Sequence, residues 1–176
     1  MATYTLISSN VLTTAASNLT FSAIPQTYTD LVLRVSARSN DAGSDQHSRC
    51  YVRPNNSAYD PSYTYLYATG TTASSGREAL GSQAGYRFQI PNAAATSNTF
   101  CNMEFYLPSY TVTQKKPSSL FSVSENNTTT TNYSWINATA GLMASSTTAI
   151  TSLYIYDDFG QFIAGSSFYL YGISNA

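Results

Sequence analysis

The chain has 176 residues and a mass of 19.1 kDa, which is long enough for one domain with a substantial hydrophobic core. Only 10% of its residues are charged, against about 25% in typical globular proteins, and it holds 26 serines and 23 threonines. Its formal net charge of -1 provides no basic field for a phosphate backbone, which excludes nucleic-acid binding as the main function. A hydrophobic share of 43%, with 15 tyrosines, indicates a folded rather than a disordered chain.

Apolar and polar residues alternate in one segment after another, with the period of a half-buried strand. The clearest case is Asp30–Arg38. One face carries Leu31, Leu33, Val35 and Ala37, and the other, wet face carries Arg34, Ser36 and Arg38. In chain order, the predicted strands are Thr3–Ile7, Leu19–Ile24, Asp30–Arg38, Arg49–Arg53, Ser62–Ala68, Gly85–Pro91, Cys101–Leu107, Ser119–Ser124, Tyr133–Ala138, Ile150–Tyr156 and Ser167–Ile173.

Turn-forming residues separate these segments, as in Ser39–Ser44 and Ala73–Gly76. The best helix candidate is the short segment Arg77–Leu80. Many short strands without strand-helix alternation are typical of an antiparallel β-sandwich, and the length favours the jelly-roll type. The sequence therefore predicts an all-β protein with a single jelly-roll domain over residues 1–176.

Neither targeting signals nor metal motifs are apparent. Residues 1–10 lack the basic and apolar regions of a signal peptide, and no segment reaches membrane-spanning length, so we expect the chain to stay in a cytoplasm until it assembles. Cys50 and Cys101 lie in strand-like segments without the spacing of a metal site. Buried reduced thiols are the preferred interpretation. A disulfide between them is the alternative if the two strands are neighbours.

Groups suited to catalysis are scarce. His47 is the single histidine and lies beside a predicted turn, so a solvated or edge-strand position is preferred over a general base. Glu104 and Glu125 lie on predicted strands, and a glycosidase needs two carboxylates across a cleft, but Glu104 alternates with Asn102 on a wet face. The sequence has no nucleophile elbow and no phosphate-binding glycine loop. We predict that the protein is not an enzyme and has no catalytic residue, no cofactor and no bound metal.

The remaining charged residues suit turns and loops. Asp157–Asp158 precedes Phe159 and a glycine, which indicates a hairpin turn rather than a calcium site. Asp41 and Asp45 lack the dense ligand spacing of a calcium loop. Lys115–Lys116 is the one basic pair and is expected in a solvated loop.

Uncharged polar residues occupy the strand positions where free soluble proteins carry Lys and Glu. Such faces lose little free energy when a partner covers them, which favours a protein that works inside an assembly. Tyr63, Tyr65 and Tyr67 share one face of a predicted strand. They are either core residues or an exposed ladder, and an exposed ladder would serve as a subunit contact or a stacking platform for sugar rings. We hypothesise a partner contact through these three residues and Tyr59.

Several segments resemble a group of virion proteins of tailed bacteriophages, including phages of cyanobacteria and other aquatic bacteria. The segments are Leu19–Ser39, then Ser124–Thr128 with Ala140–Leu142 and Thr148–Leu153, and finally Phe162–Ile173. They cover most of the chain in order, and the middle, about Asp41–Ala84, matches least. The resemblance implies a jelly-roll sandwich that self-associates, commonly as a homotrimer, and binds a symmetric assembly. It brings no catalytic residue.

The preferred hypothesis is a non-enzymatic phage structural protein, made in the host cytoplasm, that decorates or cements the capsid surface by binding major capsid protein subunits. The first alternative is a head-fibre, tail-fibre or tail-tip module that binds host surface glycan through exposed tyrosines and the loops Asp41–Ser48 or Pro54–Tyr59. A glycan-cleaving enzyme with a carboxylate pair is the third hypothesis. No nucleic-acid or membrane partner is expected.

Overall fold

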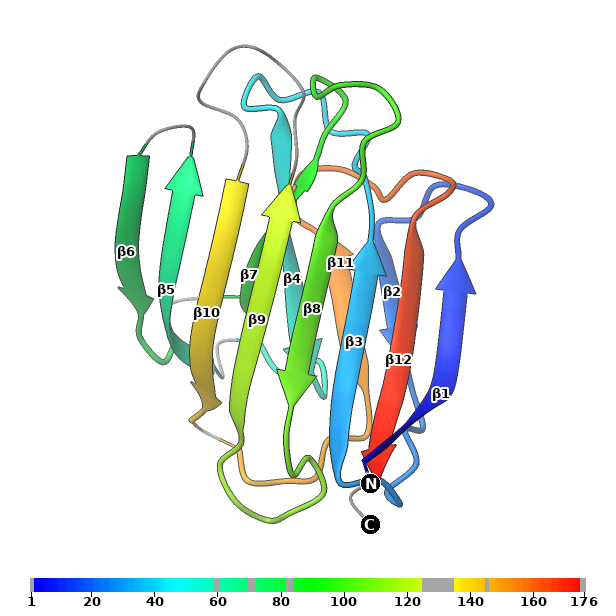
Figure 1. Ribbon diagram of the computed structural model, residues 1–176, viewed down its shortest axis with the longest axis vertical. Helices are drawn as coiled ribbons and strands as arrows, with labels where there is room; N and C mark the ends of the chain where they lie inside the picture. Colours follow the sequence, from blue (N-terminus) through cyan, green and yellow to red (C-terminus); the bar gives the residue numbers. More distant parts are fainter. Residues whose placement is uncertain are drawn as a thin grey trace.

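Every regular element in the described part of the chain is a β-strand, which confirms the all-β prediction. The computed structural model describes residues 2–58, 61–69, 72–81, 84–124, 135–144 and 146–174, and in these ranges it contains twelve strands and no helix (Figure 1). The strands are β1 (Thr3–Val11), β2 (Asn18–Phe21), β3 (Asp30–Ser36), β4 (His47–Pro54), β5 (Pro61–Thr69), β6 (Thr72–Glu78), β7 (Tyr86–Pro91), β8 (Asn102–Leu107), β9 (Pro117–Ser124), β10 (Trp135–Met143), β11 (Leu153–Asp157) and β12 (Ser167–Ser174).

The strands form two antiparallel sheets of unequal size. The large sheet has the order β1-β12-β3-β8-β9-β10-β5-β6, and the small sheet has the order β2-β11-β4-β7. The small sheet packs behind the large one, with the chain core between them (Figure 1). This arrangement confirms the antiparallel β-sandwich.

Strand alternation directs the apolar side chains into the space between the sheets. In β3, Leu31, Leu33 and Val35 belong to the core while Arg34 is exposed on the other face, where Val32 is buried as well. The small sheet supplies the opposing wall. The largest contributions from the other strands are Tyr86, Phe88 and Ile90 of β7, Met103, Phe105 and Leu107 of β8, Leu153 and Ile155 of β11, and Phe168 and Leu170 of β12.

The large sheet extends beyond the small one. Strand β7 is an edge strand of the small sheet and lies against β9, with fewer contacts to β10. Strands β5 and β6 continue past it, with no described strand of the small sheet behind them (Figure 1). We call β5, β6 and the adjoining face of β10 the overhang. It creates a step at the β7 edge where side chains from both sheets meet.

The strand predictions are confirmed for eleven of the twelve strands, but β6 is a correction. Arg77–Leu80 was the best helix candidate and Ala73–Gly76 was predicted as a turn, whereas Thr72–Glu78 forms a strand paired with β5. The physical reason is the aromatic neighbour. A Cβ at Gly76 would lie 2.5 Å from the Tyr65 ring, so the small residues of β6 make room for the tyrosines of β5. Because small polar residues give little hydrophobic alternation, β6 could not be predicted as a strand from the sequence.

Two cations expected at the surface are buried instead. The Arg38 guanidinium donates to the carbonyl oxygens of Thr96 (2.6 Å) and Ala95 (2.9 Å). The Lys116 ammonium donates to the carbonyl oxygens of Gln114 (2.9 Å) and Thr147 (3.2 Å), whereas Lys115 is exposed as predicted. Loop backbone wraps both side chains, and its carbonyl oxygens replace the hydrogen bonds to water. A sequence pattern does not reveal which loop carbonyls converge in space.

The cysteine prediction is confirmed, because Cys50 and Cys101 are free and buried. Burial raises the pKa of Cys101 to about 12, and it raises that of Cys50 well above its ordinary value. In the described part of the chain, no helix is long and apolar enough to cross a membrane.

Candidate functional site

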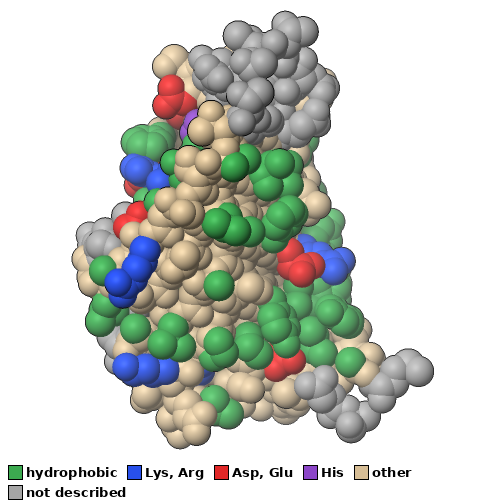
Figure 2. Space-filling view, turned by 60° about the vertical axis from the view of Figure 1, so that its left-hand side comes forward, with side chains coloured by type: hydrophobic (Ala, Val, Ile, Leu, Met, Phe, Trp, Pro, Cys, Tyr) green, Lys and Arg blue, Asp and Glu red, His purple; other side chains and the backbone are tan. Residues whose placement is uncertain are grey.

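The outer face of the large sheet combines apolar and uncharged polar side chains. Directly paired residues lie on the same face, so the register places Glu104, Phe121, Ala138 and Leu66 in one row across β8, β9, β10 and β5. Leu66 is 63% exposed, Phe121 48% and Ile136 45%. A shallow depression of about 500 Å³ follows this row. Hydrophobic side chains gather on the surface in this region (Figure 2). We call Leu66, Phe121, Ile136, Ala138 and their neighbours on this face the apolar outer face.

One exposed ion pair borders the apolar outer face. The Arg34 Nε atom lies 3.0 Å from Glu104 Oε2, and β3 and β8 pair at these two residues. Exposed pairs of this kind contribute little to stability, about 0–1 kcal/mol. The pair leaves the local charge balanced. Glu104 is therefore engaged with Arg34 on a wet face, and Glu125, its proposed partner in a carboxylate pair, lies outside the described residues.

The tyrosine stripe follows the opposite, inner face of the overhang. Tyr63 is 3% exposed and belongs to the core, whereas Tyr65 and Tyr67 are half-buried. Neighbouring rings lie 6.0 Å (Tyr63 to Tyr65) and 5.7 Å (Tyr65 to Tyr67) apart between centroids. Burial raises the pKa of Tyr63 and Tyr65 above the ordinary value. The stripe thus begins as core and emerges at the surface, and Tyr59 lies outside the described residues.

The aromatic series continues from the stripe into β10 and β4. Tyr67 stacks on Trp135 with centroids 4.9 Å apart and an interplanar angle of 8°. The ring of His47 lies 5.1 Å from that of Trp135, and the Arg87 guanidinium lies 5.5 Å from it. Asn137 Nδ2 donates to the Arg87 carbonyl oxygen (3.2 Å), which satisfies part of the exposed edge of β7. Side chains of the overhang therefore close the step at this edge.

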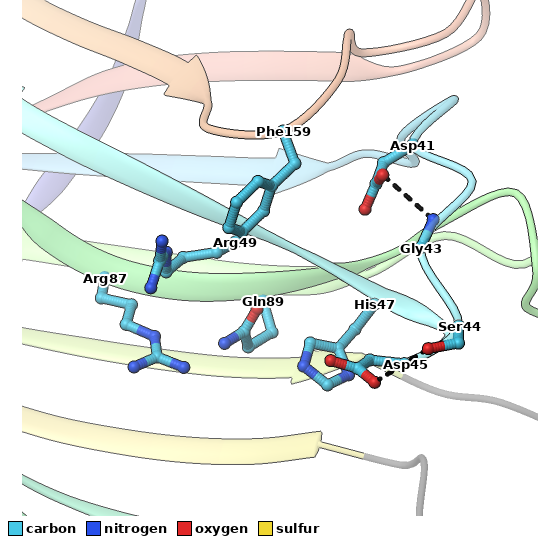
Figure 3. Close-up of a pocket in the computed structure, with 9 residues that line it drawn as sticks. All are labelled: Asp41, Gly43, Ser44, Asp45, His47, Arg49, Arg87, Gln89 and Phe159. Atoms are coloured by element: carbon cyan, nitrogen blue, oxygen red, sulfur yellow. Dashed lines mark hydrogen bonds between the residues drawn. The ribbon is translucent and has the colours of Figure 1, made fainter.

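A polar pocket of about 370 Å³ opens beside this step, on the outer side of the small sheet (Figure 3). Strands β4 and β7 supply its floor, because His47, Arg49, Arg87 and Gln89 all belong to them. The loop after β3 and the loop after β11 supply its walls. The complete lining is Asp41, Gly43, Ser44, Asp45, His47, Arg49, Arg87, Gln89 and Phe159.

Both arginines of the polar pocket are held in place. Arg49 donates to Asp158 Oδ2 through Nε (3.0 Å) and Nη2 (2.7 Å). Gln89 is buried, and the amide orientation that satisfies both of its groups lets Nε2 donate to the Ser48 carbonyl oxygen (2.8 Å). In that orientation its oxygen accepts from Arg87 Nε (3.1 Å) and Nη2 (2.7 Å). The pocket is therefore formed before any ligand arrives.

A buried carboxylate positions the loop that carries Phe159. Asp157 ends β11 and accepts hydrogen bonds from the hydroxyls of Ser48 (2.5 Å) and Ser39. The Phe159 N–H also donates to this carboxylate (3.3 Å). The predicted hairpin turn is wrong, because β11 and β12 lie in different sheets and the segment between them crosses from one sheet to the other. Asp157 is a buried anchor there, and Asp158 pairs with Arg49. Several donors share one carboxylate here, which is the usual way to stabilise a buried charge.

Asp41, Asp45 and His47, all from the segment Asp41–Ser48 that the sequence offered for glycan binding, line the polar pocket. Asp45 lies beside the His47 ring, whereas Asp41 lies apart from them and accepts from the Gly43 N–H (Figure 3). Burial lowers the pKa of His47 below its ordinary value of 6.5, although nearby Asp45 acts in the opposite direction. The imidazole is therefore neutral at pH 7 and offers one donor and one acceptor. No group of three or more His, Cys, Asp or Glu side chains in the described ranges is arranged to hold a metal ion.

Sequence reasoning missed Gln89, Arg87 and Phe159 as pocket residues. Gln89 stands between the buried Phe88 and Ile90, so alternation alone suggested only an outward polar residue. Phe159 offers the one readable signal, because an apolar ring in a turn between strands has no strand face to bury it. The pocket lining can be recognised only once β4 is known to pair with β7 and the loop after β11 is known to lie beside them.

Comparisons with known proteins leave the family open. No protein-family model matches the chain, and no curated protein matches it. Among solved structures, the chain is similar to one in the structure of infectious bursal disease virus Gx strain, at 12% identity and a TM-score of 0.13. The alignment covers 99% of this chain and 39% of that chain. A TM-score of this size carries no argument about fold or function.

Proposed function

We propose that this protein is a non-enzymatic virion structural protein of a tailed bacteriophage, which decorates or cements the capsid by binding major capsid protein subunits. The observation that carries the proposal is the apolar outer face, where Leu66, Phe121 and Ile136 are exposed among uncharged polar residues. The resemblance of three segments to phage virion proteins supports the same assignment. In this proposal the protein is a homotrimer on the capsid surface.

The area of the large sheet is suited to such a contact. Eight strands spaced by about 4.8 Å, each with 6 to 9 residues at about 3.3 Å, cover roughly 750–1,150 Å². A stable protein interface buries about 800 Å² on each partner. Apolar and hydroxyl groups cost less to desolvate than charges do, and many modest contacts repeated by symmetry add up.

The strand order supports the jelly-roll class for this subunit. Strands β1, β12, β3 and β8 lie in one sheet and β2, β11, β4 and β7 in the other, and the chain passes repeatedly between the two sheets. The four remaining strands, β9, β10, β5 and β6, extend the large sheet beyond β8. We infer that a jelly-roll framework carries an extension, and that the extension supplies most of the apolar outer face.

The proposal is tested by adding the protein to phage heads purified without it. Phe121→Glu places a carboxylate in the middle of the apolar outer face, whereas Thr20→Glu places one on the outer side of the small sheet. We expect Phe121→Glu to weaken binding to heads at least 100-fold, because an unpaired charge buried at an interface costs several kcal/mol. Thr20→Glu should bind as the unsubstituted protein does.

Cryo-EM of the assembled virion gives an independent readout. Density for this sandwich on the capsid, with the large sheet turned toward the major capsid protein, is the expected result. Equal head binding by Phe121→Glu and Thr20→Glu would refute the assigned face. Density confined to the tail would refute capsid decoration itself.

A further inference from the structure

The polar pocket lies on the small sheet, on the opposite side of the sandwich from the apolar outer face. A subunit attached through its large sheet would therefore keep this pocket turned outward. The volume of about 370 Å³ falls at the lower end of the range for small-molecule sites, roughly 300–1,000 Å³. The size suits a small ligand unit such as one ring.

The pocket lining alternates strong hydrogen-bond donors and acceptors. Arg49 and Arg87 present N–H groups from the floor, while the carboxylates of Asp41 and Asp45 accept from the wall (Figure 3). Ligand hydroxyls donate and accept at once, so they match such a lining. An apolar ligand would leave these groups unsatisfied, at a cost of about 1–3 kcal/mol for each buried group.

The formal charges around the pocket disfavour an anion. Asp41, Asp45 and Asp158 carry three formal negative charges, against two positive charges on Arg49 and Arg87. Arg49 is already engaged by Asp158 at 2.7 Å. A phosphate or carboxylate ligand would meet like charge on the wall of the pocket, whereas an uncharged polyol would not.

Phe159 supplies an apolar surface at the rim. It is 62% exposed although it is held firmly: Asp158 N–H donates to the Arg49 carbonyl oxygen (2.9 Å), and the Arg49 guanidinium lies 4.8 Å from the ring. A Cβ at Gly160 would lie 2.7 Å from Ser39 Oγ, so the loop passes close to the sandwich. The ring is thus presented to solvent beside the Arg49 guanidinium. An aromatic face beside a polar cluster is suited to the C–H side of a sugar ring.

We propose that the polar pocket binds a neutral pyranose sugar, with Phe159 stacking on the ring and Asp41, Asp45 and Arg87 binding its hydroxyls. This assignment does not depend on the proposed capsid attachment. It gives the protein a saccharide-binding side opposite the face assigned to assembly.

The test uses the full chain and the methyl α-glycosides of D-glucose, D-galactose and D-mannose as probes in saturation-transfer-difference NMR. Phe159→Ala is compared with Phe121→Ala, which removes an equally large ring, 48% exposed, from the opposite side of the sandwich. We expect at least one glycoside to bind at millimolar concentration. Phe159→Ala should weaken that binding at least 10-fold, and Phe121→Ala should leave it unchanged.

Asp45→Asn provides a second, independent variant, because this exposed side chain lies at the wall and its loss should not affect folding. It should also weaken binding at least 10-fold. Absence of signal from all three glycosides would overturn the proposal. So would equal binding by Phe159→Ala and Phe121→Ala. D-glucuronate binding more tightly than every neutral probe would overturn the assignment to neutral sugars.

Discussion

Gly141 offers the sharpest test of how the overhang joins the core. This residue of β10 pairs with Tyr63 of β5. A Cβ at position 141 would lie 2.6 Å from Tyr86 Cε1, 3.0 Å from Tyr63 Cβ and 3.3 Å from Ser118 Oγ. Tyr86 is fully buried and its ring lies 5.0 Å from that of Phe105, so it has no free space to enter. Gly141→Ala therefore forces the aromatic core apart.

The expected loss follows from two opposing effects. Overpacking a tight core costs about 1–3 kcal/mol. Replacing glycine by alanine also restricts the unfolded chain, which stabilises the protein by about 0.4–1 kcal/mol. Taking the middle of each range, the net loss should be about 1.3 kcal/mol. With a urea m-value of about 2 kcal/mol per M, the midpoint should fall by roughly 0.6–0.7 M.

Urea unfolding can be followed by circular dichroism and by the fluorescence of Trp135, the single tryptophan of the chain. Ala140→Ser is the matched control, because position 140 is exposed on the other face of the same strand. Its free energy of unfolding should stay within about 0.5 kcal/mol of that of the unsubstituted protein. The loss for Gly141→Ala combined with Tyr86→Leu should be smaller than the sum of the two single losses, since the two changes share one space. A Gly141→Ala protein as stable as the control would refute the packing described here.

Three further predictions concern buried titratable groups. Lys116→Ala should lower the free energy of unfolding by about 1.5–3 kcal/mol in urea titrations, because its ammonium donates to loop carbonyls, while Lys115→Ala should change it by less than about 0.5 kcal/mol. Equal effects of the two lysine variants would contradict this. Cys50 and Cys101 should resist Ellman's reagent at pH 8 in the native protein and both react after unfolding. Because burial raises the pKa of Cys101 from 9.0 to about 12, the stability contributed by its protonated thiol is complete below pH 9 and lost as the pH rises toward 12. Burial lowers the pKa of His47 below 6.5, so the stability contributed by its neutral imidazole is present above pH 6.5 and lost as the pH falls. The urea midpoint of His47→Asn should therefore change less between pH 7 and pH 5 than that of the unsubstituted protein. If the urea midpoint of His47→Asn fell with pH as steeply as that of the unsubstituted protein, His47 would not contribute to the pH dependence of stability.

Much of the fold was readable because strand alternation is a local property. The segment around Leu33 alternates from Leu33 onward, and it became β3 inside the large sheet. Strand β6 could not be predicted, since Ser74, Ser75 and Gly76 are small and mostly polar. They form a strand because they pair with β5 and leave room for its tyrosine rings. Arg38 and Lys116 were misplaced for a related reason. Their burial depends on loop carbonyls that are close only in the folded chain.

The candidate sites show the same division. The sequence by itself determined that Tyr63, Tyr65 and Tyr67 share a face and that few charges stand on the strands, because a period of two assigns side chains to faces. It did not determine what covers each face. Only the tertiary structure decided that Tyr63 is core while Leu66, on the other side of the same strand, is exposed. Coverage depends on how far the small sheet extends beneath the large one, which is set by contacts between residues distant in the chain.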